Sequence, residues 1–175
     1  YEDSGLPAKV IEALYQHSMR TGTLAKAIAE REQLEPDLVE EAFMAGMLHD
    51  LGKLVMVHNM PKSYGRLLTA TLEKGLPIHR AEVEIFGATH EQIGAYLIGL
   101  WGLPDAIAEA VAFHHTPQLC PEEGFGPLGA VHVADALAHR AGAVAVDGAD
   151  AHLSVPYLEA HALTERFPAW HELAQ

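Results

Sequence analysis

The stretch Ala45-Gly46-Met47-Leu48-His49-Asp50-Leu51-Gly52-Lys53 places an imidazole beside a carboxylate at the end of an apolar helical run. Successive side chains of a regular helix point about 100° apart, so His49 and Asp50 can share one target only where the helix ends or bends. We expect Gly52 to end the helix at this point. A buried carboxylate is costly unless it is paired or bound to a metal, so other parts of the chain must supply partners for Asp50.

The composition is that of a globular protein. The chain has 175 residues and 49 % of them are hydrophobic, which suits one domain with a sizeable core. No apolar run approaches the roughly 18–20 residues that span a bilayer, and no signal peptide is visible. Cys120 is the only cysteine, which excludes a disulfide framework and favours a cytoplasmic location. Because the chain begins at Tyr1 without methionine, we expect it to be an excised part of a longer protein.

Charge and histidine content narrow the possible functions. The formal net charge is -13 and the pI is about 5.2, which argues against binding to nucleic acid or to an anionic membrane. Twelve histidines accompany only eleven lysines and arginines. Histidine is the commonest metal ligand, so the positions of the histidines become the main functional signal.

Apolar residues recur at helical spacing through most of the chain, and strand signals are poor throughout. We therefore predict an all-α fold, a multi-helix bundle in a single domain over residues 1–175. Its core covers about residues 5–140, and residues 141–175 form a C-terminal helical extension. Loops are expected at 116–127 and 143–154, and Thr89 is the expected N-cap of the helix that begins at His90. The predicted helices are 6–32, 35–48, 53–58, 63–74, 80–85, 90–100, 106–114 or 115, 128–141, 156–165 and 168–173.

Five of these helical segments carry histidine or aspartate in apolar surroundings. A bundle core is where such side chains can converge, and mixed nitrogen and carboxylate ligands suit Zn, Fe, Mn, Co or Ni better than Ca. The absence of neighbouring cysteines argues against a structural zinc site. The candidate metal ligands are His17, His49, Asp50, His90, His114, His115 and Asp135.

The same residues also have ordinary structural explanations. His114 and His115 can complement a helix dipole, and Asp135 can pair with Arg140 or Lys53. Spacing alone leaves these explanations open beside metal binding. The remaining histidines are assigned to surface or structural roles; they are His58, His79, His132, His139, His152, His161 and His171.

Several motifs in a fixed order resemble one protein family. The order of His17, His49-Asp50 and Asp135 resembles the HD superfamily of metal-dependent phosphohydrolases. The segments 42–55 and 84–97 resemble its signalling branches. The run Trp101-Gly102-Leu103-Pro104, followed by Ile107 and His114-His115-Thr116-Pro117, is most similar to the HDOD domain, the HD-related output domain. The resemblance covers about residues 5–140.

The resemblance implies an all-α bundle that, in bacteria, is often fused to a response-regulator receiver or to a cyclic-nucleotide signalling domain. Many HDOD domains have lost metal ligands and are regulatory or protein-interaction modules. This chain keeps the four positions of the basic HD site, which are His17, His49, Asp50 and Asp135. His90 and His114-His115 match the additional ligands of the HD-GYP branch of cyclic di-GMP phosphodiesterases. The Gly-Tyr-Pro segment of that branch is missing from residues 116–127, which argues against cyclic di-GMP as the substrate.

Two functions are compatible with this resemblance. One is a metallophosphohydrolase that uses one or two divalent ions (Fe, Mn, Zn or Ni) on a phosphoester or cyclic nucleotide. In it Asp50 bridges the ions and Lys53 contacts a phosphate oxygen, with Arg20 as a weaker candidate for such a contact; these roles make Asp50 and Lys53 the candidate catalytic residues. The alternative for Lys53 is a surface lysine. The other function is a catalytically inactive regulatory module whose acidic surface and residues 143–175 face a partner.

Overall fold

The computed structural model describes residues 6–74, 78–121, 124–141 and 153–175, and within these ranges the chain forms helices and turns without a strand. The predicted all-α fold is confirmed. None of the helices in these ranges has both the length and the apolar character needed to cross a membrane.

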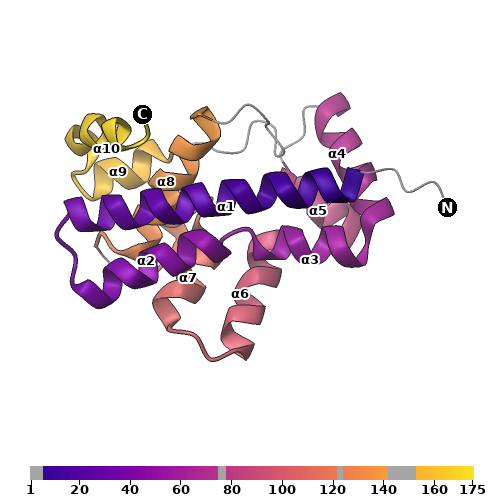
Figure 1. The fold of residues 1–175 in the computed structure, drawn as a ribbon, viewed down its shortest axis with the longest axis horizontal. Coiled ribbons are helices and arrows are strands. Elements are labelled where there is room, and N and C mark those ends of the chain that lie inside the picture. The colour runs from indigo at the N-terminus through magenta and orange to yellow at the C-terminus, as the bar shows by residue number, and fades with distance from the viewer. Residues whose placement is uncertain (1–5, 75–77, 122–123, 142–152) are drawn as a thin grey trace.

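The longest helix, α1 (Leu6–Arg31), is the element along which the others are arranged (Figure 1). Two helices, α2 (Pro36–Leu48) and α3 (Leu51–Asn59), follow one another along one side of α1. Beside the N-terminal half of α1 lie α4 (Pro61–Lys74) and α5 (Ile78–Phe86). The first five helices therefore form a group along α1, with α4 and α5 at its N-terminal end.

The remaining elements complete the bundle (Figure 1). The next two helices, α6 and α7, pack against each other, and α8 packs against α1, α2 and α7. The last helix, α10, contacts α1. In chain order the bounds are α6 His90–Leu100, α7 Asp105–Phe113, η1 Pro117–Leu119, α8 Pro127–Ala141, α9 Val155–Ala160, η2 Thr164–Arg166 and α10 Phe167–Leu173.

The interior contains two separate apolar clusters. The larger one joins the C-terminal half of α1 to α2, α7 and α8. The smaller one joins the N-terminal half of α1, through Val10 and Leu14, to α3, α4 and α5. The buried polar residues of α1 and of the α2–α3 segment lie between the two clusters in sequence; they are Ser18, Thr21, His49, Asp50 and Lys53. The two cores are therefore divided by a polar layer.

Two glycines allow α1 and α2 to approach closely. A Cβ atom added to Gly46 would lie 2.7 Å from the Cα atom of Gly22, which is closer than real Cβ contacts allow. Glycine at both positions therefore permits the close packing of these two helices.

The predicted break in the helix is present at His49-Asp50, but the expectation that Gly52 causes it is wrong. Gly52 lies inside the first turn of α3 and has no positive φ, and the helix breaks two residues earlier, at Asp50, where φ is -98° and ψ is 14°. The reason for glycine is steric, because a Cβ atom at Gly52 would overlap the carbonyl group of His90. Gly52 thus lets the start of α3 lie directly against the start of α6.

Most predicted helix bounds agree with the structure within a few residues, and one helix was predicted too long. The helix predicted at 156–165 ends at Ala160 because Ala162 adopts a left-handed conformation with φ of 54°. The Leu163 amide then donates to the Leu158 carbonyl at 2.8 Å, and the Ala162 amide donates to the Glu159 carbonyl at 3.1 Å. This is a Schellman ending, and both leucines belong to the larger core.

Other predictions at turns have mixed outcomes. Thr89 is confirmed as the N-cap of α6, in a capping box with Gln92. The predicted loop 116–127 contains a short 3₁₀ helix, η1, and its residues 122–123 lie outside the described ranges. The loop predicted at 143–154 lies outside these ranges up to residue 152.

We predict that Gly52→Ala lowers the free energy of unfolding by about 2–3 kcal/mol, because the new methyl group overlaps the backbone of α6 and forces two packed helices apart. Gly99→Ala is the matched control, since a Cβ atom there meets nothing within 4 Å. Gly99 lies inside α6, so its replacement should raise the free energy of unfolding by about 0.5–1 kcal/mol. Urea denaturation of both variants measures the two effects, and equal stability of the two variants would contradict the close approach.

Candidate metal centre

Side chains from several separate elements converge in the polar layer. The structure brings together all seven candidate ligands that the sequence predicted. His17 comes from the middle of α1, His49 and Asp50 from the α2–α3 turn, His90 from the first residue of α6, His114 and His115 from the end of α7, and Asp135 from the middle of α8. They form two groups that meet at Asp50.

The first group consists of His17, His49, Asp50 and Asp135. The Nε2 atom of His17 lies 3.2 Å from Nε2 of His49 and 2.9 Å from Oδ1 of Asp135. The Nε2 atom of His49 lies 3.5 Å from Oδ2 of Asp50. Two nitrogens and two carboxylates are thus directed at one another within the distances that a shared metal ion would require.

The second group consists of His90, His114 and His115. One ligand atom from each of these side chains lies within 4.8 Å of the others. The Oδ1 atom of Asp50 lies 3.5 Å from Nε2 of His90 and 3.9 Å from Nε2 of His114. Asp50 therefore directs Oδ2 toward the first group and Oδ1 toward the second, which is the geometry of a bridging carboxylate.

Hydrogen bonds on the far side of three rings leave their Nε2 atoms available as ligands. The Nδ1 atom of His49 lies 2.7 Å from the Gly46 carbonyl, and that of His114 lies 2.9 Å from the Val111 carbonyl. The Nδ1 atom of His90 lies 2.8 Å from the Glu82 carboxylate. These oxygens only accept hydrogen bonds, so Nδ1 carries the proton and Nε2 keeps its lone pair in the neutral ring.

Three buried imidazole nitrogens in the second group have no hydrogen-bond partner; they are the Nε2 atoms of His90, His114 and His115. Each buried polar atom without a partner costs about 1–3 kcal/mol. Three such atoms in one place indicate that a ligand satisfies them, and a transition metal ion is the ligand that neutral imidazoles bind. The residues present therefore fit a metal ion.

The buried carboxylates are also compatible with a bound cation. Among the residues that the structure describes, the buried acidic and basic side chains other than histidine are four carboxylates and one ammonium. The carboxylates are those of Asp50, Glu82, Glu91 and Asp135, and the ammonium is that of Lys53. Because an unpaired buried charge is strongly unfavourable, these carboxylates depend on nearby positive charge, which protonated histidines or a bound cation can supply.

The aspartate pKa values reflect the surrounding positive groups. Burial acts to raise the pKa of Asp50, but His49 and Lys53 outweigh it and bring this pKa well below its ordinary value. Burial likewise opposes ionisation of Asp135, yet hydrogen bonds from His139, His17 and His49 hold its pKa well below the ordinary value. Both carboxylates are therefore ionised at neutral pH.

The histidine pKa values divide into two pairs. Burial acts to lower the pKa of both His49 and His90, but nearby carboxylates raise each pKa above its ordinary value. Burial also acts on His114 and His115, and there no carboxylate compensates fully. The pKa of His114 falls to about 3, and that of His115 falls well below its ordinary value.

Lys53 is not a surface lysine, because its side chain is fully buried. Its Nζ atom lies 3.0 Å from Oδ1 of Asp50 and 3.1 Å from Oδ2. Lys53 therefore neutralises Asp50 directly. Asp135 pairs with His17 and His139, and the side chain of Arg140 lies outside the described part of the structure. The Arg20 guanidinium donates to the Ala174 carbonyl at 3.2 Å, which ties α1 to the C-terminus.

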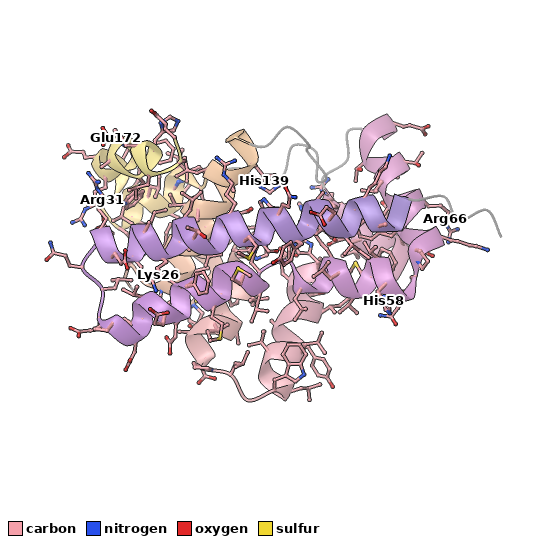
Figure 2. The ribbon with its side chains drawn as sticks, in the orientation of Figure 1. Lys26, Arg31, His58, Arg66, His139 and Glu172 are labelled. Atoms are coloured by element: carbon pink, nitrogen blue, oxygen red, sulfur yellow. The ribbon has the colours of Figure 1, made fainter. Side chains whose placement is uncertain are left out.

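His139 and Glu82 contact predicted ligands, although the sequence analysis selected neither of them as a site residue. His139, which is labelled in Figure 2, was assigned to a surface or structural role. Its Nδ1 atom lies 3.0 Å from Oδ1 of Asp135. It lies one helical turn after Asp135, and this i, i+4 spacing was the signal that could have identified it. Glu82 contacts His90 from a different helix, and its position in the sequence carries no comparable signal.

His132 keeps the structural role predicted for it. Its Nδ1 atom lies 2.6 Å from the His114 carbonyl, and its Nε2 atom accepts a hydrogen bond of 2.9 Å from the Ser154 amide. It therefore supports the turn that carries His114 and His115.

We predict that the metal-free protein is most stable near pH 6.5, the ordinary histidine pKa being about that value. The raised pKa values of His49 and His90 give stability that is complete below about pH 6.5 and is lost as the pH rises through the folded-state pKa values. The lowered pKa values of His114 and His115 give stability that is complete above about pH 6.5 and is lost as the pH falls. Urea denaturation in the presence of a chelator, from about pH 5 to 8.5, measures the profile.

Added Mn²⁺ or Zn²⁺ should shift this stability maximum to higher pH, because metal ligation requires neutral imidazoles. A metal-free profile that rises steadily across the whole range would contradict the assignment of the two histidine pairs.

The chain is similar in sequence to parts of longer proteins. A protein of Treponema pallidum with no assigned function is 30 % identical over 115 residues, which is 66 % of this chain and 22 % of that protein. A cyclic di-GMP phosphodiesterase of Pseudomonas aeruginosa is 31 % identical over 134 residues, which is 76 % of this chain and 29 % of that enzyme. The chain thus spans less than a third of the length of either relative.

Solved structures share the fold. An HDOD domain protein of unknown function from Geobacter sulfurreducens is 25 % identical with a TM-score of 0.65, covering 90 % of this chain and 52 % of that chain. The MmoQ response regulator from Methylococcus capsulatus is 19 % identical with a TM-score of 0.61, covering 91 % of this chain and 60 % of that chain, and it shows the fold alone. The sequence model of the HDOD domain family matches residues 4–117 of this chain. This chain therefore belongs to the HDOD family.

Proposed function

We propose that this HDOD domain is a metal-dependent phosphohydrolase of a bacterial signalling protein and acts on a nucleotide-type phosphoester. The observation that carries the proposal is Asp50, whose two oxygens face two separate groups of histidines. Two metal ions bridged by one carboxylate are a common arrangement for hydrolysing phosphate esters. The relative from Pseudomonas aeruginosa is a cyclic di-GMP phosphodiesterase, which supports phosphodiester chemistry.

In this proposal each group of ligands would hold one divalent ion of Fe, Mn, Zn or Ni. His17, His49 and Asp135 would hold the first ion and His90, His114 and His115 the second, with Asp50 available as a ligand to both. When bound, the two ions supply a hydroxide nucleophile near neutral pH and neutralise the phosphate oxygens. The protein contributes fixed ligand positions, since hydrogen bonds to Gly46, Val111 and Glu82 orient three of the rings.

The exposed atoms of the site suggest where the substrate enters. His17, His115 and His139 have side chains that are 14 %, 10 % and 13 % exposed, whereas Asp50 is 1 % exposed. We place the entrance beside these three rings. Lys53 neutralises Asp50 behind the ligands, and its predicted contact with a phosphate oxygen remains part of the proposal.

The identity of the phosphoester is restricted by the sequence after His115. Residues 116–127 lack the Gly-Tyr-Pro segment of the HD-GYP enzymes. We therefore favour a nucleotide-type phosphoester other than cyclic di-GMP, with a receiver or another signalling domain of the same protein as the regulatory partner.

A second candidate function is a regulatory protein-interaction module, and one observation favours it. Tyr96, Leu100 and Trp101 at the end of α6 are 67 %, 63 % and 58 % exposed. Three large apolar side chains so close in sequence and so exposed are typical of a protein-binding surface. The same helix starts at His90, so one element joins this surface to the candidate metal centre.

We predict that the purified protein contains close to two transition metal ions per chain and hydrolyses a phosphodiester when Mn²⁺ or Fe²⁺ is supplied. Asp50→Asn should lower both metal content and turnover, the latter by more than about 100-fold, because it removes the shared anionic ligand. Asp37→Asn is the control, since Asp37 is exposed at the start of α2. Metal analysis by mass spectrometry and assays with cyclic di-GMP, pGpG, mononucleotides and bis(p-nitrophenyl) phosphate measure these effects.

The two candidate functions give different results in this experiment. Bound metal with no turnover of any of these substrates would favour the regulatory module. Absence of transition metal from both the wild-type protein and the Asp50→Asn variant would refute the metal centre itself.

A further inference from the structure

Glu82 is a buried carboxylate that belongs to neither group of candidate ligands. It lies in α5, which contributes no ligand, and its side chain is completely buried. Its Oε2 atom accepts a hydrogen bond of 3.0 Å from the His90 amide. Both carboxylate oxygens also lie within hydrogen-bond distance of Nδ1 of His90, at 2.9 and 2.8 Å. One side chain thus holds both the backbone and the ring of His90.

The contacts from Glu82 are not required to cap the N-terminus of α6. The N-terminus of α6 already has a capping box between Thr89 and Gln92. The additional bonds from Glu82 fix the rotation of the His90 ring, so that Nε2 lies 3.5 Å from Oδ1 of Asp50. Glu82 therefore determines where the unpartnered nitrogen of His90 points.

The charged hydrogen-bond partner Glu82 distinguishes the His90 ring from the rings of His49 and His114. His49 and His114 donate their Nδ1 protons to backbone carbonyls, which are neutral acceptors. His90 donates to a carboxylate instead. A carboxylate behind a ligating imidazole raises its basicity and strengthens metal binding. Nε2 of His90 should therefore bind a metal ion more strongly than Nε2 of His49 or His114, whose Nδ1 atoms face uncharged carbonyls.

The second group has particular need of this charge. Its three ligands are imidazoles, and Oδ1 of Asp50, which it shares with the first group, lies 3.5 Å from Nε2 of His90. The carboxylates of Glu91 and Asp135 are more distant, 3.9 Å from Nδ1 of His90 and of His115. The first group has the Asp135 carboxylate in addition. A divalent ion held by His90, His114 and His115 is therefore the one whose stability depends most on a further carboxylate nearby.

We propose that Glu82 is a positioning residue that selectively strengthens the second metal site, by orienting His90 and supplying negative charge through its ring. This inference rests on the proposed function, because it assumes that two ions bind. Glu82 acts through His90 and makes no contact of its own with the metal.

Glu82→Gln tests the charge without removing the side chain. The amide oxygen can still accept the Nδ1 proton of His90, so a purely structural role is largely preserved. Glu84→Gln is the matched control, because Glu84 is exposed on the same helix. Titration of the metal-free proteins with Mn²⁺ and Co²⁺, followed by calorimetry and by the Co²⁺ absorption spectrum, measures the two binding steps separately. Circular dichroism confirms the fold of each variant.

We expect Glu82→Gln to bind the first ion as the wild type does and to bind the second about 10–100-fold more weakly. Glu84→Gln should bind both ions as the wild type does. If Glu82→Gln retains wild-type affinity for the second ion, or weakens both ions equally, Glu82 has no selective role. If Glu82→Gln does not fold, Glu82→Asp replaces it, because the shorter side chain withdraws the carboxylate from His90; wild-type affinity for the second ion in that variant would overturn the proposal.

The failures of the two proposals can be distinguished. A wild-type protein that binds fewer than two ions refutes the binuclear site and this inference together. A wild-type protein that binds two ions and hydrolyses a phosphodiester, with no change in Glu82→Gln, removes the role of Glu82 alone.

Discussion

The buried carboxylate of Asp50 is the constraint on which the rest of this structure depends. An ionised group in this position must be surrounded by positive charge or donors, and the fold supplies His17, His49, His90 and Lys53 around it. Each of these partners requires its own helix to pass the same point. The break between α2 and α3 at Asp50 and the close contact of Gly52 with the start of α6 are consequences of this requirement.

The parts of the site that could be predicted are those in which residue type alone carries the signal. Each predicted ligand is a polar residue in an apolar helical segment, and this contrast can be seen in the sequence. The residues are His17, His49, Asp50, His90, His114, His115 and Asp135. The all-α fold was predictable for a similar reason, since apolar spacing repeats along nearly the whole chain.

The parts that could not be predicted depend on contacts between helices. Gly52 looked like a helix terminator because glycine often ends helices, whereas its role is to make room for the backbone of a distant helix. Glu82 lies in a segment that reads as an ordinary acidic helix, and only the packing of α5 against the start of α6 reveals its partner. The left-handed conformation of Ala162, which ends α9 early, likewise depends on the burial of Leu163 rather than on a local glycine.

The polar layer gives the candidate metal centre a mechanical role in addition to a chemical one. The larger core packs around α2, α7 and α8 and the smaller core around α3, α4 and α5, and α1 passes through both. Hydrophobic contact holds each core together internally, but along the layer between them the contacts are polar and depend on charge. Ligands from both sides of this layer meet at Asp50, so an ion bound there would join the two halves directly. In such an arrangement metal occupancy and the relative position of the halves are linked by the same free energy. A domain of this kind could report metal or ligand binding to a neighbouring protein even where turnover is slow, so the two proposed functions, hydrolysis and regulation, are compatible with one site.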